Sequence, residues 1–264
     1  NVAGISIRGI IMRDGATGFG EEVASSAEIV PFIIDADKDE SIKAIVIDIN
    51  SPGGSAVASD EIAQALKRTH KPTVSIIHEV GASGGYWIAS ATNKIIANRM
   101  SITGSIGVIA SYLEFSGLFD KYGIEYERMV AGKYKDMGTP FKNLSNEERT
   151  ILQSKLDKLH AQFIQEIAQN RKLSVDKVKK LATGEFYLGE EAQQLGLVDM
   201  LGDEETLKQY LRETLQVDDI DFVVYESQPT LLSALTRIAQ ENFFFMGEGI
   251  GKALTQEKDF AIMT

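Results

Sequence analysis

Short apolar runs alternate with helical patterns along the first two-thirds of the chain. Residues 44–49 form an almost continuous apolar run, and residues 73–77 form another. Such runs are typical of parallel strands that are covered on both faces. Each run is followed by a glycine-rich loop and then by a helical pattern, at 60–67 and at 86–91. This order predicts right-handed βαβ units and a largely parallel sheet.

Other segments extend this pattern at both ends. After Lys142 the pattern becomes helical, and Ser145 and Glu148 have the spacing of a capping box. Another short helix is expected from Ser174. We also expect a helix at 25–37 that Pro31 interrupts, and strands at 2–12, 94–97, 106–110, 126–130 and 219–225.

The long predicted helix carries an apolar stripe with spacings of three and four residues. Such a stripe packs either into the core of one subunit or against a second subunit. We therefore predict a main domain at 1–228, with an oligomerisation helix near 145–170, and a helical appendage with a mobile tail at 229–264. The stripe consists of Leu152, Leu156, Leu159, Phe163 and Ile167.

Composition narrows the class of protein. The chain has 264 residues, 44% of them apolar, and a formal net charge of −11, which argues against nucleic acid as the main partner. No apolar run reaches the roughly 18 residues that a membrane span needs. The absence of cysteine excludes disulfides, thiolate nucleophiles and cysteine zinc sites. Because the sequence begins with Asn1, we expect that an upstream targeting or anchoring segment has been removed.

Two glycine-rich loops follow predicted parallel strands, where ligand sites lie in open α/β sheets. They are Ser51–Gly54 and Gly81–Gly85. The second loop matches G-x-S-x-G between a strand and a helix, a pattern that exposes the hydroxyl of Ser83 beside backbone N–H groups. Ser83 is therefore a candidate nucleophile. The alternative is a helix-capping serine in a close-packed turn.

A serine nucleophile needs a base, and histidine is a weak candidate here. His70 and His160 are expected on the surface, and His78 precedes Ser83 by only five residues. In an α/β-hydrolase the histidine follows the serine in the chain, which leaves only His160. The histidine-triad interpretation is therefore weak.

Lysine is the other possible base, because a desolvated lysine loses its proton near neutral pH. Lys133 and Lys135 lie in a short linker between two glycines, directly after a predicted strand. The spacing does not choose between them. The alternative is that both are ordinary surface lysines.

Five sequence motifs follow one another along the chain: N-S-P-G-G at 50–54, G-A-S-G-G-Y at 81–86, T-G-S-I-G at 103–107, G-K-Y-K at 132–135 and G-E-E-A…G-L-V-D at 189–199. Together they resemble bacterial signal peptide peptidase A, most closely the short single-repeat form of Gram-positive bacteria such as Bacillus. The resemblance runs from the first strand to about Tyr225. It implies the Clp-protease/crotonase-type ββα spiral, an α/β fold, to which the helical C-terminal appendage would be added.

The resemblance also implies roles for individual residues. Ser83 is similar to the family's nucleophile, Lys135 to its general base, and Ser105 to the serine that orients this lysine. The oxyanion hole corresponds to backbone N–H groups of Gly84 and of the turn at Gly53 and Gly54. Which of the two turn glycines donates stays open.

The activity implied is hydrolysis of released signal peptides and other apolar peptides through an acyl-enzyme, without metal or nucleotide. Short family members resemble a bowl of eight subunits, in which serine and lysine of one site come from neighbouring subunits. The resemblance further implies a membrane anchor before Asn1 and a domain outside the cytoplasm. Two other classes remain open: a crotonase-type acyl-CoA enzyme, which needs carboxylates at the centre, and a non-catalytic scaffold of the same fold.

Overall fold

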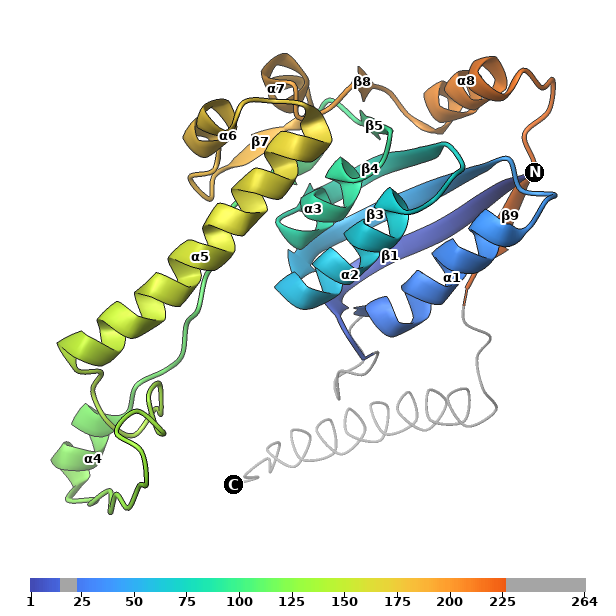
Figure 1. Ribbon diagram of the computed structural model, residues 1–264. Coiled ribbons are helices and arrows are strands. Elements are labelled where there is room, and N and C mark those ends of the chain that lie inside the picture. The colour runs from blue at the N-terminus through green and yellow to red at the C-terminus, as the bar shows by residue number, and fades with distance from the viewer. Residues whose placement is uncertain (15–22, 227–264) are drawn as a thin grey trace, which may run out of the picture. The chain divides into compact units, whose positions relative to one another are not determined.

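Parallel strands form the frame of the fold in the computed structural model (Figure 1). Within the described residues the central path of the sheet runs β2-β1-β3-β4-β5-β8, and only β6 and β7 pair antiparallel. The strands are β1 (Val2–Met12), β2 (Val23–Ser25), β3 (Ala44–Gly54), β4 (Thr73–Ala82), β5 (Lys94–Ala97), β6 (Ile102–Gly104), β7 (Phe186–Leu188), β8 (Met200–Leu201) and β9 (Phe222–Tyr225), which pairs with β1.

The structure describes residues 1–14 and 23–226. Asn1–Tyr225 form one unit, and the predicted boundary at 228 and the predicted appendage at 229–264 lie outside the described residues. The helices are α1 (Ser26–Lys38), α2 (Ala56–Lys67), α3 (Gly84–Ser90), α4 (Ser116–Tyr122), α5 (Asn146–Arg171), α6 (Val175–Leu181), α7 (Gly189–Leu195) and α8 (Glu204–Leu215).

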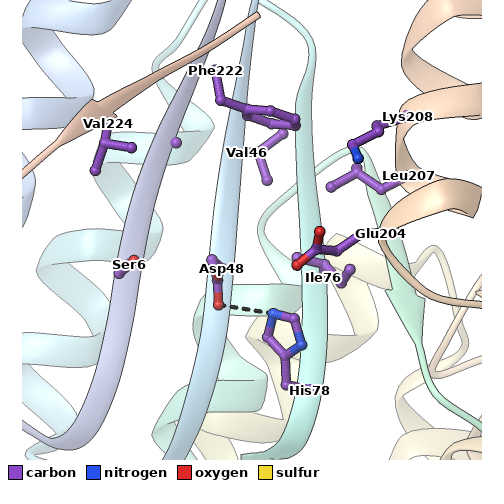
Figure 2. A pocket seen from close by; sticks show the side chains of 11 residues that line it. Ser6, Val46, Asp48, Ile76, His78, Glu204, Leu207, Lys208, Phe222 and Val224 are labelled. Atoms are coloured by element: carbon purple, nitrogen blue, oxygen red, sulfur yellow. Dashed lines mark ion pairs between the residues drawn. The ribbon is translucent and has the colours of Figure 1, made fainter. Parts of the chain in front are cut away.

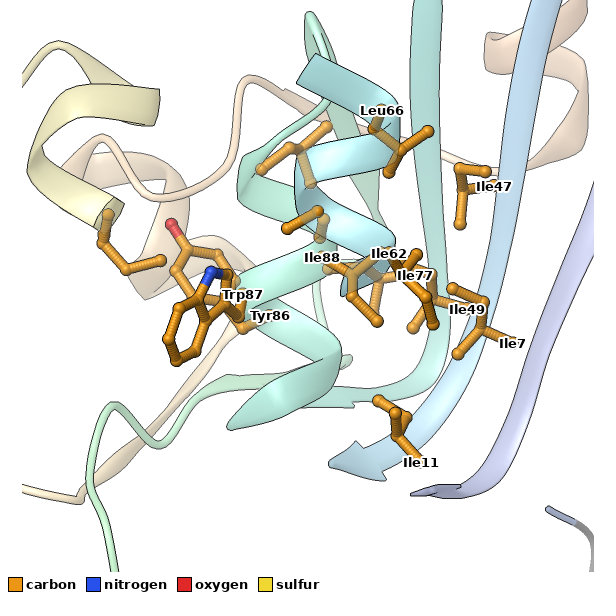
Figure 3. Packing of buried hydrophobic residues seen from close by; sticks show 14 of the residues in the cluster. Ile7, Ile11, Ile47, Ile49, Ile62, Leu66, Ile77, Tyr86, Trp87 and Ile88 are labelled. Carbon is orange, nitrogen blue, oxygen red and sulfur yellow. The ribbon is translucent and has the colours of Figure 1, made fainter. Parts of the chain in front are cut away.

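Helices cover the two faces of the sheet unequally. α1, α2 and α3 lie over one face, where Ile49 and Ile77 of the strands meet Ile62 of α2 in the main core (Figures 1 and 3). On the other face α8 contributes Leu207 and Leu211 to a smaller apolar cluster. The predicted parallel α/β fold of the Clp-protease type is confirmed.

Arg171, at the end of α5, anchors the last predicted motif. Its guanidinium makes two hydrogen bonds of 2.9 Å to the carboxylate of Asp199, and its side chain is only 8% exposed. Asp199 also accepts the N–H of Ile95 at 2.8 Å, so it joins α5 to β5. The pair therefore explains why the G-L-V-D motif ends in aspartate.

We predict that Arg171→Met lowers the free energy of unfolding by about 3–5 kcal/mol, because it leaves the Asp199 carboxylate without its partner. Urea denaturation followed by circular dichroism measures the change. Lys208→Met removes an exposed ion pair to Glu205 and serves as the control, with no shift of the midpoint expected. Equal midpoints for the two variants would contradict the prediction.

Two predicted strands and one predicted helix break are wrong. Residues 106–110 and 126–130 form no strand, and Ile109 and Met129 are 85% and 94% exposed. Within the described part of the chain no neighbouring strand pairs with them, and an unpaired strand has no ladder to stabilise it. α1 continues through Pro31, because Pro31 and Ala27 lie on the exposed side, where water can reach the freed carbonyl.

The apolar stripe of α5 divides into two halves. Phe163 and Ile167 are buried, and the ring of Phe163 stacks on Trp87 of α3 at 4.6 Å between ring centroids. Leu159 is 46% exposed, and Leu152 and Leu156 are half-buried. The C-terminal half therefore packs into the core of the same chain, whereas the N-terminal half extends beyond this core.

Residues 107–145, which we call the arm, fold largely on themselves. The Phe115 N–H donates to the Pro140 carbonyl at 2.7 Å, and the rings of Phe119 and Phe141 stack at 5.6 Å. Arg128 binds the carboxylate of Asp136 and lowers its pKa to about 2. The arm lies at the N-terminal end of α5, away from α3 (Figure 1).

Candidate functional site

The turn between β4 and α3 presents Ser83 in an unusual backbone conformation. Its φ of 51° and ψ of −119° belong to a region that favours glycine. Its N–H donates to the Gly104 carbonyl at 2.8 Å, and its carbonyl accepts the Trp87 N–H at 2.9 Å. Ser83 is half-exposed between buried neighbours, and its hydroxyl has no partner among the described residues. The turn thus holds the backbone and leaves the hydroxyl available.

Glycines allow the two glycine-rich loops to meet backbone to backbone. A Cβ at Gly53, where φ is 105°, would lie 2.7 Å from the nitrogen of Gly84 and 2.9 Å from the Cβ of Ser83. A Cβ at Gly84 would collide with the hydroxyl of Ser59 and lie 3.3 Å from the nitrogen of Gly54. Side chains at either glycine would therefore force the loops apart.

The hydrogen bonds distinguish the N–H groups of this turn. The Gly53 N–H donates to the hydroxyl of Ser51 at 3.1 Å and is therefore occupied. The Ser55 N–H donates to the Ile11 carbonyl of β1 at 2.8 Å. Because successive N–H groups of a strand point to opposite sides, the Gly54 N–H points away from β1, and the Gly54 nitrogen lies close to Gly84. Gly84 is the first residue of α3, so its N–H has no partner within the helix.

Ser105 lies directly beside this turn. The hydrogen bond from the Ser83 N–H ends on Gly104, the residue before Ser105. Ser105 has a φ of 49°, its N–H donates to the Glu185 carbonyl at 2.9 Å, and its hydroxyl donates to the Gly184 carbonyl at 3.3 Å. The structure therefore brings together Ser83, Ser105 and the glycines at 53, 54 and 84.

Among the predicted site residues, Lys135 lies on the arm, which is placed away from α3 (Figure 1). It lies exposed in a turn of the arm, where its backbone N–H donates to the Gly132 carbonyl at 3.1 Å. Its ammonium group has no partner among the described residues. In contrast, Lys133 binds the Glu147 carboxylate at 2.5 Å, and this hydrogen bond raises the pKa of Lys133 to about 12. The two lysines of this motif are therefore in different environments.

No histidine is placed to serve Ser83 within the described residues. His78 points into a pocket of about 180 Å³ on the opposite face of the sheet from α2, where it lies 3.1 Å from Asp48 (Figure 2). The adjacent residue Ile77 packs into the main core, and side chains alternate between faces along a strand. His70 is exposed as predicted. His160 is not simply solvated, since its Nε2 is buried without a partner in the described part of the chain.

The described ranges 1–14 and 23–226 contain no cluster of three or more side chains suited to bind a metal ion. They also contain no helix that is both long and apolar enough to span a bilayer.

Two buried serines without a predicted role support the turn. Ser51 bonds to the N–H of Gly53, and Ser59 packs against Gly84. Ser51 belongs to the N-S-P-G-G motif, so the motif itself was the available signal. Ser59 carries no such signal, because its closeness to Gly84 arises only when α2 and α3 pack together.

Comparisons with known proteins agree with this geometry. Residues 65–218 match the model of peptidase family S49, and residues 7–115 match that of Clp protease. A homologue from Enterococcus faecium named signal peptide peptidase SppA is 31% identical over 86% of this chain and 67% of its own. Protease 4 of Haemophilus influenzae is 34% identical over 76% of this chain, which corresponds to 32% of that longer protein.

Proposed function

The chain belongs to peptidase family S49 and is a serine protease of the signal peptide peptidase type, and from that premise we propose that Ser83 and Lys135 form its catalytic dyad. The observation that carries the proposal is the free hydroxyl of Ser83 beside the N–H groups of Gly54 and Gly84. This is the arrangement that acyl transfer needs.

In the proposed reaction the neutral amine of Lys135 takes the proton of the Ser83 hydroxyl. The Ser83 oxygen attacks the carbonyl carbon of a peptide bond, and the Gly54 and Gly84 N–H groups stabilise the resulting oxyanion. Collapse of this intermediate breaks the C–N bond, and the leaving amine receives the proton from the lysine. Water then hydrolyses the serine ester. Ser105 would orient the lysine amine, and neither metal nor nucleotide takes part.

Within one protomer, however, the arm that carries Lys135 lies at the N-terminal end of α5, away from α3 (Figure 1). We propose that the lysine of one subunit serves the serine of its neighbour in a homo-oligomer, of eight subunits by the family resemblance. Exposure of the arm supports this proposal, since Ile109, Leu113 and Met129 are 85%, 74% and 94% exposed. Apolar side chains exposed to this extent in one region are typical of an interface.

Complementation tests the shared site. We predict that Ser83→Ala and Lys135→Ala proteins, each inactive, regain part of the activity when they are unfolded, mixed and refolded together. Mixed oligomers then contain some sites with both residues intact. If both residues acted within one chain, every site would carry one defect and mixing would restore nothing, even if light scattering showed an oligomer.

The proposed substrates are released signal peptides and other apolar peptides. The resemblance to signal peptide peptidase A also supports membrane attachment, with the domain outside the cytoplasm. A fluorescent apolar peptide, incubated in parallel with an acyl-CoA thioester, tests the substrate class. Cleavage of the peptide alone supports the proposal, and turnover of the thioester alone would favour the crotonase-type alternative.

A further inference from the structure

The hydrogen-bond ladders that join β3 to β1 and to β4 are both interrupted near residues 50 and 51. The β1–β3 pairing shifts register between Arg8 and Ile10, and the β3–β4 pairing shifts between Ile49 and Ser51. Such breaks leave backbone groups without strand partners, and the next residue, Pro52, has no N–H to offer. The two turn glycines follow at once. The repair of this break therefore decides where their N–H groups point.

The side chains of Asn50 and Ser51 form hydrogen bonds with backbone groups beside this interruption. Asn50 accepts the Val80 N–H of β4 at 3.1 Å. On the other side, the Ser51 hydroxyl donates to the Gly9 carbonyl of β1 at 2.6 Å and accepts the Gly53 N–H at 3.1 Å. Ser51 is fully buried, and its carbonyl lies 2.9 Å from where a Cβ of Gly85 would be. One residue thus joins β1, the glycine turn and the start of α3.

We propose that Ser51 is a positioning residue of the oxyanion hole. Its hydroxyl occupies the Gly53 N–H and so leaves the Gly54 N–H as the donor that the turn offers to substrate. Without this hydroxyl, the Gly53 N–H loses its side-chain partner, and the turn is held by the pairing of Gly53 and Gly54 with Ile10 and Ile11 of β1. Glycine has no Cβ to restrict its backbone, so the turn can then shift. The inference rests on the proposed function, and Ser51 itself is too deeply buried to touch substrate.

The test measures stabilisation of the oxyanion separately from the affinity for substrate. In Ser51→Ala we expect kcat to fall about 10- to 100-fold while KM stays nearly constant, as for a group that acts only in the transition state. The affinity for a peptide aldehyde should fall by a similar factor, because its adduct with Ser83 places an oxygen in the oxyanion hole. The matching peptide amide forms no such adduct and should bind as before. Ser51→Thr keeps the hydroxyl and should recover most of kcat.

Ser75→Ala is the matched control. Ser75 is also fully buried, and its hydroxyl accepts a hydrogen bond from Thr92 at 3.1 Å, in the half of β4 that lies away from the turn. It loses a buried hydroxyl without changing the turn, so kcat and aldehyde affinity should stay at wild-type values. If Ser51→Ala does not fold, Ser51→Cys keeps the size of the side chain, and its weakly hydrogen-bonding thiol should give the same loss of kcat.

Two results would overturn the inference. One is a Ser51 variant without the hydroxyl whose kcat and aldehyde affinity stay within about two-fold of wild type. The other is an equal loss in Ser75→Ala. Failure of the proposed function looks different: the wild-type protein would then cleave no apolar peptide, and the aldehyde would bind Ser83→Ala as tightly as wild type.

Discussion

Ser83→Ala should abolish peptidase activity and leave the protein folded. Removal of a serine nucleophile costs about 10⁴- to 10⁶-fold in kcat when the rest of the site stays intact. Alanine keeps the Cβ, and the Ser83 hydroxyl makes no hydrogen bond within the described residues, so the turn loses no contact. Turnover of a fluorescent apolar peptide measures the first effect, and circular dichroism with thermal denaturation measures the second.

Ser83→Gly extends this experiment to the backbone. At a φ of 51° and a ψ of −119°, any residue with a Cβ is strained by about 1–3 kcal/mol. Glycine relieves this strain, so the variant should be inactive and yet more stable than both wild type and Ser83→Ala. Near-wild-type turnover of either variant would eliminate Ser83 as the nucleophile. A glycine variant that is less stable than the alanine variant would eliminate the strain argument.

Much of the sheet could be predicted from local sequence. The apolar runs at 44–49 and 73–77 lie in the central strands β3 and β4, where burial on both faces demands such residues. Both strands extend further than the runs, up to Gly54 and Ala82. Apart from Val80, the extensions consist of small or polar residues, and none of them belongs to the main core.

The two wrongly predicted strands have a different explanation. Residues 106–110 and 126–130 have strand-like composition, yet within the described residues nothing pairs with them. Sequence patterns report what a segment is able to form, whereas pairing depends on which neighbours the fold supplies. The same limit applies to Lys135, because neither spacing nor composition states what lies opposite the arm.

The sequence identified the glycines of the site, but it did not show which of Gly53 and Gly54 has the free N–H group. Gly53 and Gly54 are adjacent, and both have a positive φ. At both positions a Cβ would also lie too close to neighbouring backbone atoms. Only the hydrogen bond from Gly53 to Ser51 and the alternation along β3 distinguish them. That distinction arises from the register of three strands, which no local motif encodes.

Lys135→Ala should lose activity by about three orders of magnitude or more, as expected when a general base is removed, while Lys133→Ala should lose far less. A base must be neutral to accept a proton. Lys133 is held in its charged form, since the Glu147 carboxylate raises its pKa to about 12. The ammonium group of Lys135 has no partner in the described residues, so a neighbouring subunit can desolvate it and favour the neutral amine.

The pH dependence of kcat/KM supplies the second readout for the lysines. Because the neutral amine is the active form, the rate should rise with pH as the base loses its proton, and Lys133→Ala should keep this rise. If the proposed oligomer shares its sites, dilution that dissociates it should remove activity from wild type, since each Ser83 would then lack the lysine of a neighbouring subunit. Greater loss in Lys133→Ala than in Lys135→Ala would move the base to Lys133. A profile with a single ionisation near 6.5, the ordinary value for histidine, would instead point to His78 and to a rearranged β4.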